Sequence, residues 1–313
     1  MLLRVETEAG KGTHQTMMQR TMQRNQTRPS APPVLAAGHP NRPDWSLEFP
    51  HEVDGDLQQD SEWCHLRIHG ERRRLRFHDY DQIYLIPGLY EHLFYEKLKC
   101  SSPQVIAELL SKQVDASDDS MGDLKILDLG AGNGMVGEAL IEAGADSVIG
   151  VDIIREAAQA TKRDRPGLYE DYLVDDLTQP SSATRTRLDR EPFTCLASVS
   201  ALGFGDIPPL AFCEAFNAVS TPGWVAFNIK EDFLTRRDDT GFCGLIHRMF
   251  DEGIMEMRDR RRYQHRLGVS GQPLYYVAVI ATKERDVPEP WMAALREENG
   301  AVDGSPAAEA SPA

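Results

Sequence analysis

The stretch LDLGAGNGMVG combines one aspartate, Asp128, with four glycines. Counting from Gly132 gives the spacing G-x-G-x-x-G, which ends at Gly137 and is typical of loops that bind NAD or FAD. Counting from Asp128 instead gives an acid followed by glycines at alternate positions, from Gly130 to Gly134. This second pattern suits a different nucleotide-derived molecule, so the two spacings predict different ligands.

The charge of Asp128 favours the second ligand. A glycine turn between a strand and a helix lets backbone amides approach a ligand at the positive end of the helix dipole. NAD and FAD would place a doubly negative pyrophosphate at this turn, where a neighbouring carboxylate would oppose binding by on the order of several kcal/mol at an effective dielectric constant of about 20. S-adenosylmethionine has no phosphate and carries an ammonium and a sulfonium group, which a carboxylate attracts. The sequence therefore favours S-adenosylmethionine.

Two further acids end the next two predicted strands. Asp152 follows Gly134 by 18 residues, where a carboxylate can accept hydrogen bonds from the ribose hydroxyls of either kind of cofactor. Asp176 ends the third strand, where it can accept a hydrogen bond from the adenine amino group, while Ile153 and Leu177 cover the two faces of the ring. Acids at three successive strand ends disfavour a pyrophosphate and favour a cation.

An alternation of short apolar runs and helical stretches positions these residues. Strands are predicted at 124–129, 147–152, 172–175, 193–199 and 224–229, and helices near 102–114, 134–144, 154–163, 208–219 and 240–252. Alternating strands and helices predict a parallel sheet covered on both faces, so the predicted fold class is α/β. Near the carboxyl end, RYQHRLGV and PLYYVAVIATK flank SGQ and predict an antiparallel hairpin at the edge of the sheet.

A β-hairpin and a helical cap are predicted upstream of this alternation, over residues 45–100. WCHLRIH alternates apolar and polar side chains at 63–69, and a second alternation places Leu75 and Phe77 on one side. An aromatic-rich stretch, HDYDQIYLIPGLYEHLFYEKL, follows the hairpin. In folds of this kind such a segment is expected to lie over the ligand.

Both ends of the chain have the composition of disordered segments. Residues 1–44 are predicted to be disordered, because 9–43 contain no Asp or Glu and are rich in Gln, Thr, Met, Arg and Pro, which cannot bury enough apolar surface. The lack of acids leaves an organelle transit peptide as a minor alternative. Residues 286–313, which end in ENGAVDGSPAAEASPA, are predicted to be a flexible tail. The globular part then consists of the 45–100 cap and a domain over 101–285.

The overall composition disfavours two broad classes of protein. No apolar run among the 313 residues approaches the roughly 20 needed to cross a bilayer. With 34 basic and 49 acidic residues the net charge is −15, which repels phosphate backbones. Five widely spaced cysteines without a C-x-x-C pair indicate neither a disulfide framework nor a zinc site, and favour a reducing compartment. We therefore expect a cytoplasmic protein with no membrane or nucleic-acid partner; its oligomeric state is not predicted.

Four segments, ILDLGAGNG, VIGVDI, YLVDDL and PLYYVAVIATK, occur in the order and at the spacing of class I S-adenosylmethionine-dependent methyltransferases, which the chain resembles over about residues 101–285. PGLYEDYLVDDLTQP followed by STPGWVAFNIKEDF is similar to the type 11/12 methyltransferase-like proteins, including the one named for the Williams–Beuren chromosomal region. The resemblance implies a Rossmann-like, doubly wound sheet of seven strands with the last strand antiparallel, and S-adenosyl-L-methionine as cofactor. The cofactor-binding residues it implies are Asp128, Gly130, Ala131, Gly132, Gly134, Asp152, Ile153, Asp176, Leu177 and Ser198.

The same resemblance implies an enzyme that transfers a methyl group. Methyl transfer is an in-line displacement, in which the protein mainly aligns the acceptor and excludes water. The catalytic candidates are Tyr84, Tyr90 and His92, from the segment expected over the cofactor, with Tyr80, Phe204 and Lys230 as further residues on the acceptor side. Alternatively, the tyrosines are the apolar stripe of a packed helix and His92 is a solvated helix residue.

The predicted acceptor is a small molecule methylated on oxygen or nitrogen. The segment after the fourth strand, SVSALGFGD, lacks the N-P-P-[YF] motif of enzymes that methylate amino groups of nucleic acids and glutamine. A protein or RNA methyltransferase, or a non-catalytic protein that binds S-adenosylmethionine in regulation or assembly, remains an alternative. No metal is expected.

The most basic run of the chain is GERRRLRFH, residues 70–78. It is either the exposed face of the predicted hairpin or an anchor for an acidic acceptor. In the second case Arg72, Arg74 or Arg76 would hold a carboxylate or a phosphate of the acceptor.

Overall fold

A computed structural model of the protein describes residues 44–50, 57–190, 192–234 and 240–303. The compact unit that carries the fold spans Leu47–Ala313 and includes both the cap and the main sheet. The predicted disordered segment, with its transit-peptide alternative, lies outside the described residues apart from Asp44. No helix in the described part of the chain is long and apolar enough to span a bilayer.

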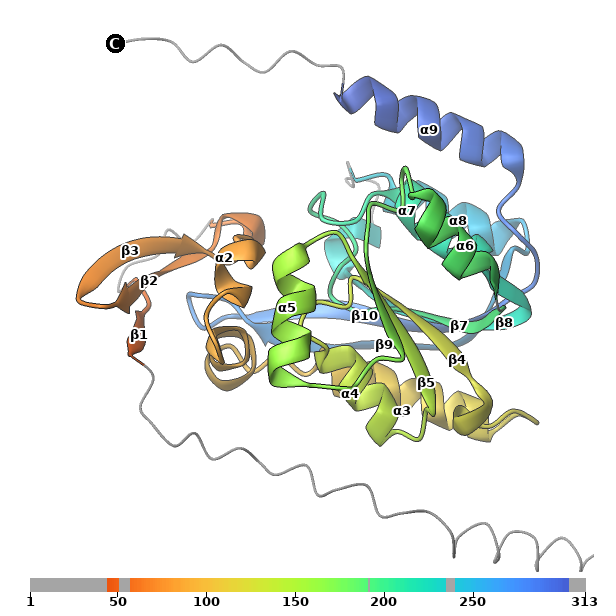
Figure 1. Ribbon diagram of the computed structural model, residues 1–313. Helices are drawn as coiled ribbons and strands as arrows, with labels where there is room; N and C mark the ends of the chain where they lie inside the picture. The colour runs from red at the N-terminus through yellow and green to blue at the C-terminus, as the bar shows by residue number, and fades with distance from the viewer. Residues whose placement is uncertain (1–43, 51–56, 191, 235–239, 304–313) are drawn as a thin grey trace, which may run out of the picture. The chain divides into compact units, whose positions relative to one another are not determined.

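A sheet of seven strands forms the centre of the fold (Figure 1). Its strands are β4 (Lys125–Leu129), β5 (Ser147–Asp152), β6 (Asp171–Val174), β7 (Phe193–Ser198), β8 (Val219–Lys230), β9 (Met255–Leu267) and β10 (Pro273–Lys283). They lie in the order β6-β5-β4-β7-β8-β10-β9. The first five strands are parallel, and β10 is antiparallel to both β8 and β9. The predicted α/β class and the Rossmann-like sheet with an antiparallel last strand are confirmed.

Helices cover both faces of this sheet (Figure 1). They are α3 (Ser102–Asp115), α4 (Met135–Glu142), α5 (Arg155–Asp164), α6 (Ser182–Arg190), α7 (Pro209–Asn217), α8 (Phe242–Asp251) and α9 (Glu289–Asp303). Because side chains alternate along a strand, Ile126 of β4 packs with α3 and α4, whereas its neighbour Leu127 packs with α7 and α8. Burial on both faces explains why the central strands β4, β5 and β7 are nearly continuous apolar runs. Helix α6 was not predicted, because its sequence SATRTRLDR is almost entirely polar.

The chain after β10 differs from the predicted flexible tail. Helix α9 begins at Glu289, and the side chains of Trp291 and Met292 are buried in the same core as α7 and α8. The guanidinium of Arg248 lies 3.5 Å from the centre of the Trp291 ring. Trp291 and Met292 therefore attach α9 to the core, although the rest of this segment has the composition of a linker.

The cap contains the predicted hairpin. Strands β2 (Trp63–Ile68) and β3 (Glu71–Arg76) pair antiparallel, and their sheet has the order β1-β2-β3 with β1 at Trp45–Glu48. Cys64, Leu66 and Leu75 are buried, as the alternation predicted. The remaining short elements are η1 (Gln59–Ser61), α2 (Tyr80–Tyr84), the π-helical segment η2 (Glu91–Lys97), η3 (Met121–Asp123) and η4 (Glu231–Leu234).

Candidate functional site

A cavity of about 390 Å³ lies at the carboxyl ends of the parallel strands. Segments that follow β4, β5, β6 and β7 form its wall together with the cap and residues of β9 and β10. Ligands of open α/β sheets bind in this position, because the chain leaves the central strand toward opposite sides and opens a crevice there. The predicted site residues that line it are Tyr80, Tyr84, Tyr90, Gly130, Ala131, Gly132, Asp152, Ile153, Asp176, Leu177 and Phe204.

The glycine turn is fixed in the cavity wall by hydrogen bonds to Gly132. Its N–H donates to Asp152 Oδ2 at 2.9 Å, and its carbonyl accepts from Thr161 Oγ1 at 2.8 Å and Tyr172 Oη at 2.7 Å. The φ of Gly132 is +54°, and a Cβ at this position would lie 2.6 Å from Tyr84 Oη. A larger side chain would therefore strain the backbone and fill the space between the turn and Tyr84.

The acids that end β5 and β6 lie in the cavity wall, as predicted. Asp152 Oδ1 accepts from the Ile154 N–H at 2.8 Å, and burial raises the pKa of this carboxyl. Asp176 Oδ1 accepts from a backbone N–H and a hydroxyl two residues later. Ile153, which is 61% exposed, and Leu177 present apolar surface beside these carboxylates. This half of the cavity suits a nucleoside, whose hydroxyls need acceptors and whose flat base needs apolar cover.

Asp128 does not line the cavity. The alternation along β4 places its side chain on the same face as Ile126, where α3 and α4 cover it, and it is 0% exposed. Its Oδ2 accepts from Tyr169 Oη at 2.7 Å, while Oδ1 has no partner among the described groups. Burial raises the pKa of this carboxyl to about 7. The structure thus places Asp128 behind the wall, and the charge that faces the cavity comes from other acids.

Gly137, the last glycine of the G-x-G-x-x-G spacing, makes room for the buried hydrogen bond between Tyr169 and Asp128. A Cβ on Gly137 would lie 2.7 Å from the Tyr169 ring. The missing side chain lets Tyr169 cross helix α4 and reach Asp128. The spacing therefore has a packing role in this chain and does not by itself indicate a dinucleotide.

We expect the substitution Asp128→Asn to change how stability depends on pH. The carboxyl has a folded-state pKa of about 7, above the ordinary value of 3.8, so the stability it contributes is complete below about pH 4 and is lost as the pH rises through 7. Asparagine does not titrate. From pH 5 to pH 8 the free energy of unfolding of the wild type should therefore fall more than that of the variant. The difference should be on the order of 2 kcal/mol, at about 1.4 kcal/mol per pH unit.

Urea denaturation without ligand at both pH values measures this difference. The exposed Asp251, at the end of α8, provides the control Asp251→Asn. Equal pH dependence of all three proteins would show that Asp128 is ionised in the fold at an ordinary pKa.

Tyr84 and Tyr90 line the cavity from the cap, where the tyrosine rings stack in a row. The ring centres of Tyr84 and Tyr90 are 5.0 Å apart, and those of Tyr80 and Tyr84 are 6.2 Å apart. Burial raises the pKa of all three phenols, so they stay protonated at neutral pH. Because a general base works best with a pKa near the working pH, these tyrosines can donate hydrogen bonds but are poor bases.

The remaining predicted residues, His92, Gly134, Ser198 and Lys230, do not line the cavity, and Lys230 Nζ lies 2.9 Å from Asp232 Oδ2. His92 Nδ1 lies 2.6 Å from Glu96 Oε2 on η2. Gly134, with a φ of +92°, begins α4, and the buried Ser198 donates to the Leu129 carbonyl at 3.1 Å. A π-helical turn contains more residues than an α-helical one, which changes the side chains that face the cavity. The structure therefore does not place His92 beside a reacting group.

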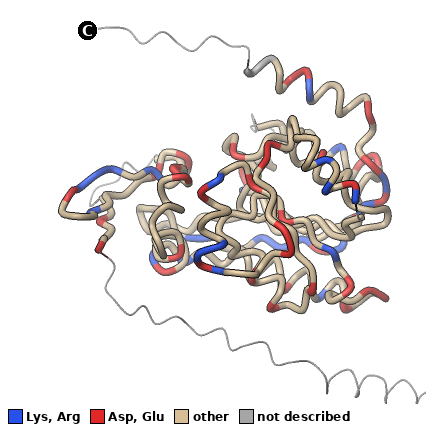
Figure 2. The backbone as a smooth tube through the Cα atoms, viewed as in Figure 1, with Lys and Arg blue, Asp and Glu red and all other residues tan. Residues whose placement is uncertain are grey.

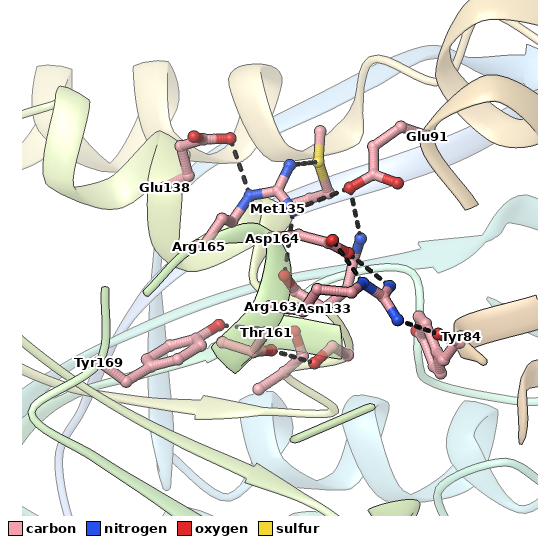
Figure 3. A network of polar contacts seen from close by, with 12 residues as sticks. Tyr84, Glu91, Asn133, Met135, Glu138, Thr161, Arg163, Asp164, Arg165 and Tyr169 are labelled. Atoms are coloured by element: carbon pink, nitrogen blue, oxygen red, sulfur yellow. Dashed lines mark hydrogen bonds and ion pairs between the residues drawn. The ribbon is translucent and has the colours of Figure 1, made fainter. Parts of the chain in front are cut away.

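A network of ion pairs and hydrogen bonds fixes the cap to the glycine turn (Figure 3). Arg165, at the end of α5, lies 2.9 Å from Glu91 of the cap. The same carboxylate accepts from Asn133 Nδ2, in the glycine turn, at 2.7 Å. Arg163 donates to the Tyr84 carbonyl at 3.0 Å. Helix α5 therefore holds Tyr84 and Glu91 over the turn.

Two polar residues that the sequence pattern did not single out also line the cavity. His78 Nδ1 lies 3.3 Å from Asp206 Oδ2, and their side chains are 13% and 31% exposed. His78 follows β3 in the cap, and Asp206 lies in the loop after β7. The two residues are far apart in the sequence, so no local spacing predicts the pair. The sequence indicated only that each belongs to a segment expected near the ligand.

A second pair that sequence analysis missed is the ion pair of Arg266 with Glu62. The Nη2–Oε2 distance is 2.5 Å, and both side chains are 4% exposed. Arg266 lines the cavity from the end of β9, whereas Glu62 lies just before β2. The guanidinium therefore reaches the site with its charge already neutralised.

The arginines of the basic run lie outside the cavity, whereas Phe77 and His78 at its end line it. Figure 2 shows the positive charges along β3, and Arg72, Arg74 and Arg76 are absent from the cavity wall. Arg72 Nε lies 3.1 Å from Glu48, and the Arg74 guanidinium lies 4.4 Å from the centre of the Trp63 ring. The structure therefore favours the interpretation of this run as an exposed face.

The sequence matches no protein-family model and no curated protein. Among solved structures, magnesium protoporphyrin IX methyltransferase from Synechocystis PCC 6803, with bound SAM, is 14% identical with a TM-score of 0.41, over 58% of this chain and 79% of that chain. Ribosomal protein L11 methylase from Lactobacillus delbrueckii subsp. bulgaricus is 15% identical with a TM-score of 0.39, over 57% of this chain and 77% of that chain. A SAM-dependent methyltransferase from Mesorhizobium loti is 16% identical with a TM-score of 0.39, over 56% of this chain and 98% of that chain. The sheet has the seven strands and the antiparallel last strand expected from the resemblance to class I S-adenosylmethionine-dependent methyltransferases.

Proposed function

We propose that the protein is an S-adenosylmethionine-dependent methyltransferase that transfers a methyl group to an oxygen or nitrogen of a small-molecule acceptor. The observation that carries this proposal is the cavity at the strand ends, where a glycine turn, carboxylates and apolar side chains meet. Its nucleoside half, which we define as Asp152, Ile153, Asp176 and Leu177, follows β5 and β6.

The residues of the nucleoside half fit this cofactor. Asp152 would accept from the ribose hydroxyls, and Asp176 from the adenine amino group, while Ile153 and Leu177 cover the ring. Gly132 donates to Asp152 through its N–H, and its missing side chain lets Tyr84 Oη lie directly against the turn, so both residues border the cofactor. When bound, the sulfonium supplies an electrophilic methyl carbon and a neutral thioether as leaving group.

The charges around the cavity argue against a dinucleotide. The carboxylates in its wall are Asp152, Asp175, Asp176 and Asp206. Arg266 is the guanidinium in this wall, and Glu62 neutralises it. A pyrophosphate would therefore meet uncompensated negative charge, whereas a sulfonium and an ammonium would be attracted.

The cap favours a small acceptor. The cavity of about 390 Å³ falls in the range of small-molecule sites, which is roughly 300–1,000 Å³. Aromatic side chains of the cap cover it, and the network of Arg165 with Glu91 holds the cap in place. A polymer segment would have to displace these contacts, and the net charge of −15 opposes a nucleic acid.

Isothermal titration calorimetry tests the cofactor. We expect S-adenosylhomocysteine to bind with one-to-one stoichiometry and NADH to give no heat of binding. The reason is that the acids of the nucleoside half accept hydrogen bonds from a nucleoside but repel a pyrophosphate. Binding of NADH without binding of S-adenosylhomocysteine would instead show a dinucleotide site.

Transfer of a labelled methyl group tests the enzyme. The protein, incubated with methyl-labelled S-adenosylmethionine and a metabolite extract, should move label into the small-molecule fraction. Label in the protein or RNA fraction would show a macromolecular acceptor. Binding of S-adenosylhomocysteine with no transfer to any fraction would show a non-catalytic binding protein.

A further inference from the structure

A second half of the cavity lies across β4 from the nucleoside half. We define this acceptor half as Phe77, His78, Tyr80, Phe204, Asp206 and Arg266. Since β4 lies between β5 and β7, the loop after β7 borders the opposite side of the glycine turn. A Cβ on Gly130 would lie 2.7 Å from Ala201 Cβ, so this loop lies directly against the turn. A molecule in the acceptor half therefore meets the cofactor at the glycine turn.

A tight turn fixes His78 at the end of the hairpin. The Arg76 N–H donates to Asp79 Oδ2 at 3.0 Å, and the Asp79 N–H donates to the Arg76 carbonyl at 3.2 Å. Between them Phe77 is 1% exposed and packs edge-on against Phe94, with the ring centres 5.9 Å apart. Because Phe77 is anchored in the core, the next side chain, His78, is held in the cavity wall.

The loop after β7 fixes Asp206. Gly203 and Phe204 have φ values of +92° and +54°, and the Asp206 N–H donates to the Gly203 carbonyl at 3.2 Å. The Phe233 ring occupies the space where a Cβ of Gly203 would lie. The loop is therefore a well-defined turn, and it places Phe204 and Asp206 in the cavity wall.

These two turns create a histidine–carboxylate pair inside the cavity. The distance between His78 Nδ1 and Asp206 Oδ2 is 3.3 Å. The His78 ring packs between Tyr80 and Phe204, with ring centres 5.5 and 5.4 Å away. Within the described ranges Nε2 of His78 has no hydrogen-bond partner. The contact is at ion-pair distance, and a carboxylate near Nδ1 favours the tautomer with its proton on that nitrogen, which leaves Nε2 as an acceptor.

Burial keeps the other titratable side chains that line the acceptor side of the cavity, apart from Arg266, in their neutral forms near neutral pH. Burial raises the pKa of Tyr80, Tyr276 and Cys100 and lowers the pKa of His265. Arg266 forms a buried ion pair with Glu62. An imidazole is the side chain that ordinarily changes charge near neutral pH. His78 is thus the side chain of the acceptor half best suited to exchange a proton with a ligand.

We propose that His78 is the catalytic base for an aromatic acceptor that carries a hydroxyl group, and that Asp206 is its positioning residue. This inference rests on the proposed methyltransferase function and names its substrate class. As the acceptor oxygen attacks the methyl carbon, His78 Nε2 takes the hydroxyl proton. A carbon–oxygen bond forms, and the carbon–sulfur bond breaks with its electron pair on sulfur. The products are an aryl methyl ether, S-adenosylhomocysteine and an imidazolium stabilised by Asp206, which then releases its proton to solvent.

The chemistry of the acceptor half favours an aromatic hydroxyl over other nucleophiles. Phe77, Tyr80 and Phe204 offer ring faces and edges to a flat molecule. A carboxylate needs no base and would be repelled by Asp206. A phenol has an ordinary pKa of about 10, so at neutral pH it is protonated and needs a base to become a strong nucleophile.

The chromogenic probe 4-nitrophenol tests this without turnover, because its phenolate is yellow and its phenol is not. The probe is titrated with pH in the presence of saturating S-adenosylhomocysteine and wild-type protein. We expect bound probe to ionise at a pH lower than free probe by about one unit or more, since His78 takes the proton and stays beside the phenolate. In His78→Gln this shift should disappear while S-adenosylhomocysteine still binds. His247→Gln, on the exposed face of α8, is the control and should retain the shift.

Turnover with a phenol provides the second readout. His78→Gln should slow methyl transfer by roughly 100-fold or more, the usual contribution of a general base. Asp206→Asn should move the acid limb of the pH–rate profile, which a merely structural change would leave in place. Asp206→Glu, which keeps the carboxylate, should restore part of the rate.

The outcomes separate the two proposals. If S-adenosylhomocysteine does not bind the wild type, the methyltransferase proposal fails. If it binds but nitrophenol ionises at the same pH with wild type and His78→Gln, the assignment of His78 as base is wrong. Methylation of amines but not of phenols would overturn the substrate class.

Discussion

The substitution Gly132→Val should abolish binding of S-adenosylhomocysteine. Gly132 has a φ of +54°, a conformation that costs a β-branched residue about 1–3 kcal/mol. Its new side chain would also enter the space beside Tyr84 Oη, which lies 2.6 Å from the Cβ position, and overpacking costs about 1–3 kcal/mol more. Both costs lower the stability of the fold, whereas affinity falls because the valine and the displaced Tyr84 ring occupy a part of the cavity wall. A loss of about 3 kcal/mol in binding free energy would raise the dissociation constant roughly 100-fold. Calorimetry with S-adenosylhomocysteine measures this loss.

Gly271 provides a matched control for backbone strain. Its φ is +81°, and no atom lies within 4 Å of the position of an added Cβ. It lies in the turn between β9 and β10 and does not line the cavity. Gly271→Val should therefore lose stability without losing affinity. Equal affinity of wild type and Gly132→Val would place the cofactor outside the glycine turn and contradict the proposed function.

The substitution Glu62→Gln should destabilise the fold by about 3–5 kcal/mol, because it leaves a buried guanidinium without its counter-ion. Both side chains of the pair are 4% exposed, and the Glu62 Oε1 also accepts from the Val269 N–H at 2.6 Å. Glutamine retains the shape and an acceptor oxygen but removes the charge. Urea denaturation at neutral pH measures the change in the free energy of unfolding.

Removing both charges is the informative control. The double variant Glu62→Leu with Arg266→Met replaces the ion pair by apolar side chains, and it should cost less than Glu62→Gln alone. An exposed pair such as Arg248 with Glu252 should cost about 1 kcal/mol or less when broken. A loss for Glu62→Gln no larger than that of the exposed pair would show that water reaches Arg266.

The positions of the nucleoside half could be predicted from the sequence, because each of its residues lies at or shortly after the end of a strand. An apolar run fixes where a strand ends, and the topology brings the ends of β5 and β6 to one edge of the sheet. Asp152, Ile153, Asp176 and Leu177 therefore lie in the cavity wall as expected. The fold class followed from the same regular alternation.

The direction of a side chain was harder to predict than its position in the chain. Asp128 lies on β4 where expected, but the alternation of the strand turns it toward α3 and α4, and Tyr169 covers it. His92 belongs to a π-helical segment, whose side-chain spacing differs from that of an α-helix. In both cases the residue was correctly assigned to its element, and the geometry within that element decided the outcome.

The histidine–carboxylate pair could not be predicted from spacing. His78 and Asp206 come from a turn after β3 and a loop after β7, and they meet because the cap folds over the sheet. Helix α9 was missed for a related reason, since Trp291 and Met292 gain their burial from α7 and α8. Contacts between distant segments carry this information, and a local pattern contains none of it.

The two halves of the cavity differ in how the chain builds them. The nucleoside half and the glycine turn come from one continuous stretch between Leu129 and Leu177, whereas the acceptor half draws on the cap, the loop after β7 and the last hairpin. Mutations in the cap can thus change the acceptor half without touching the residues that build the nucleoside half. The cap is accordingly the practical place to redesign which molecule enters the acceptor half.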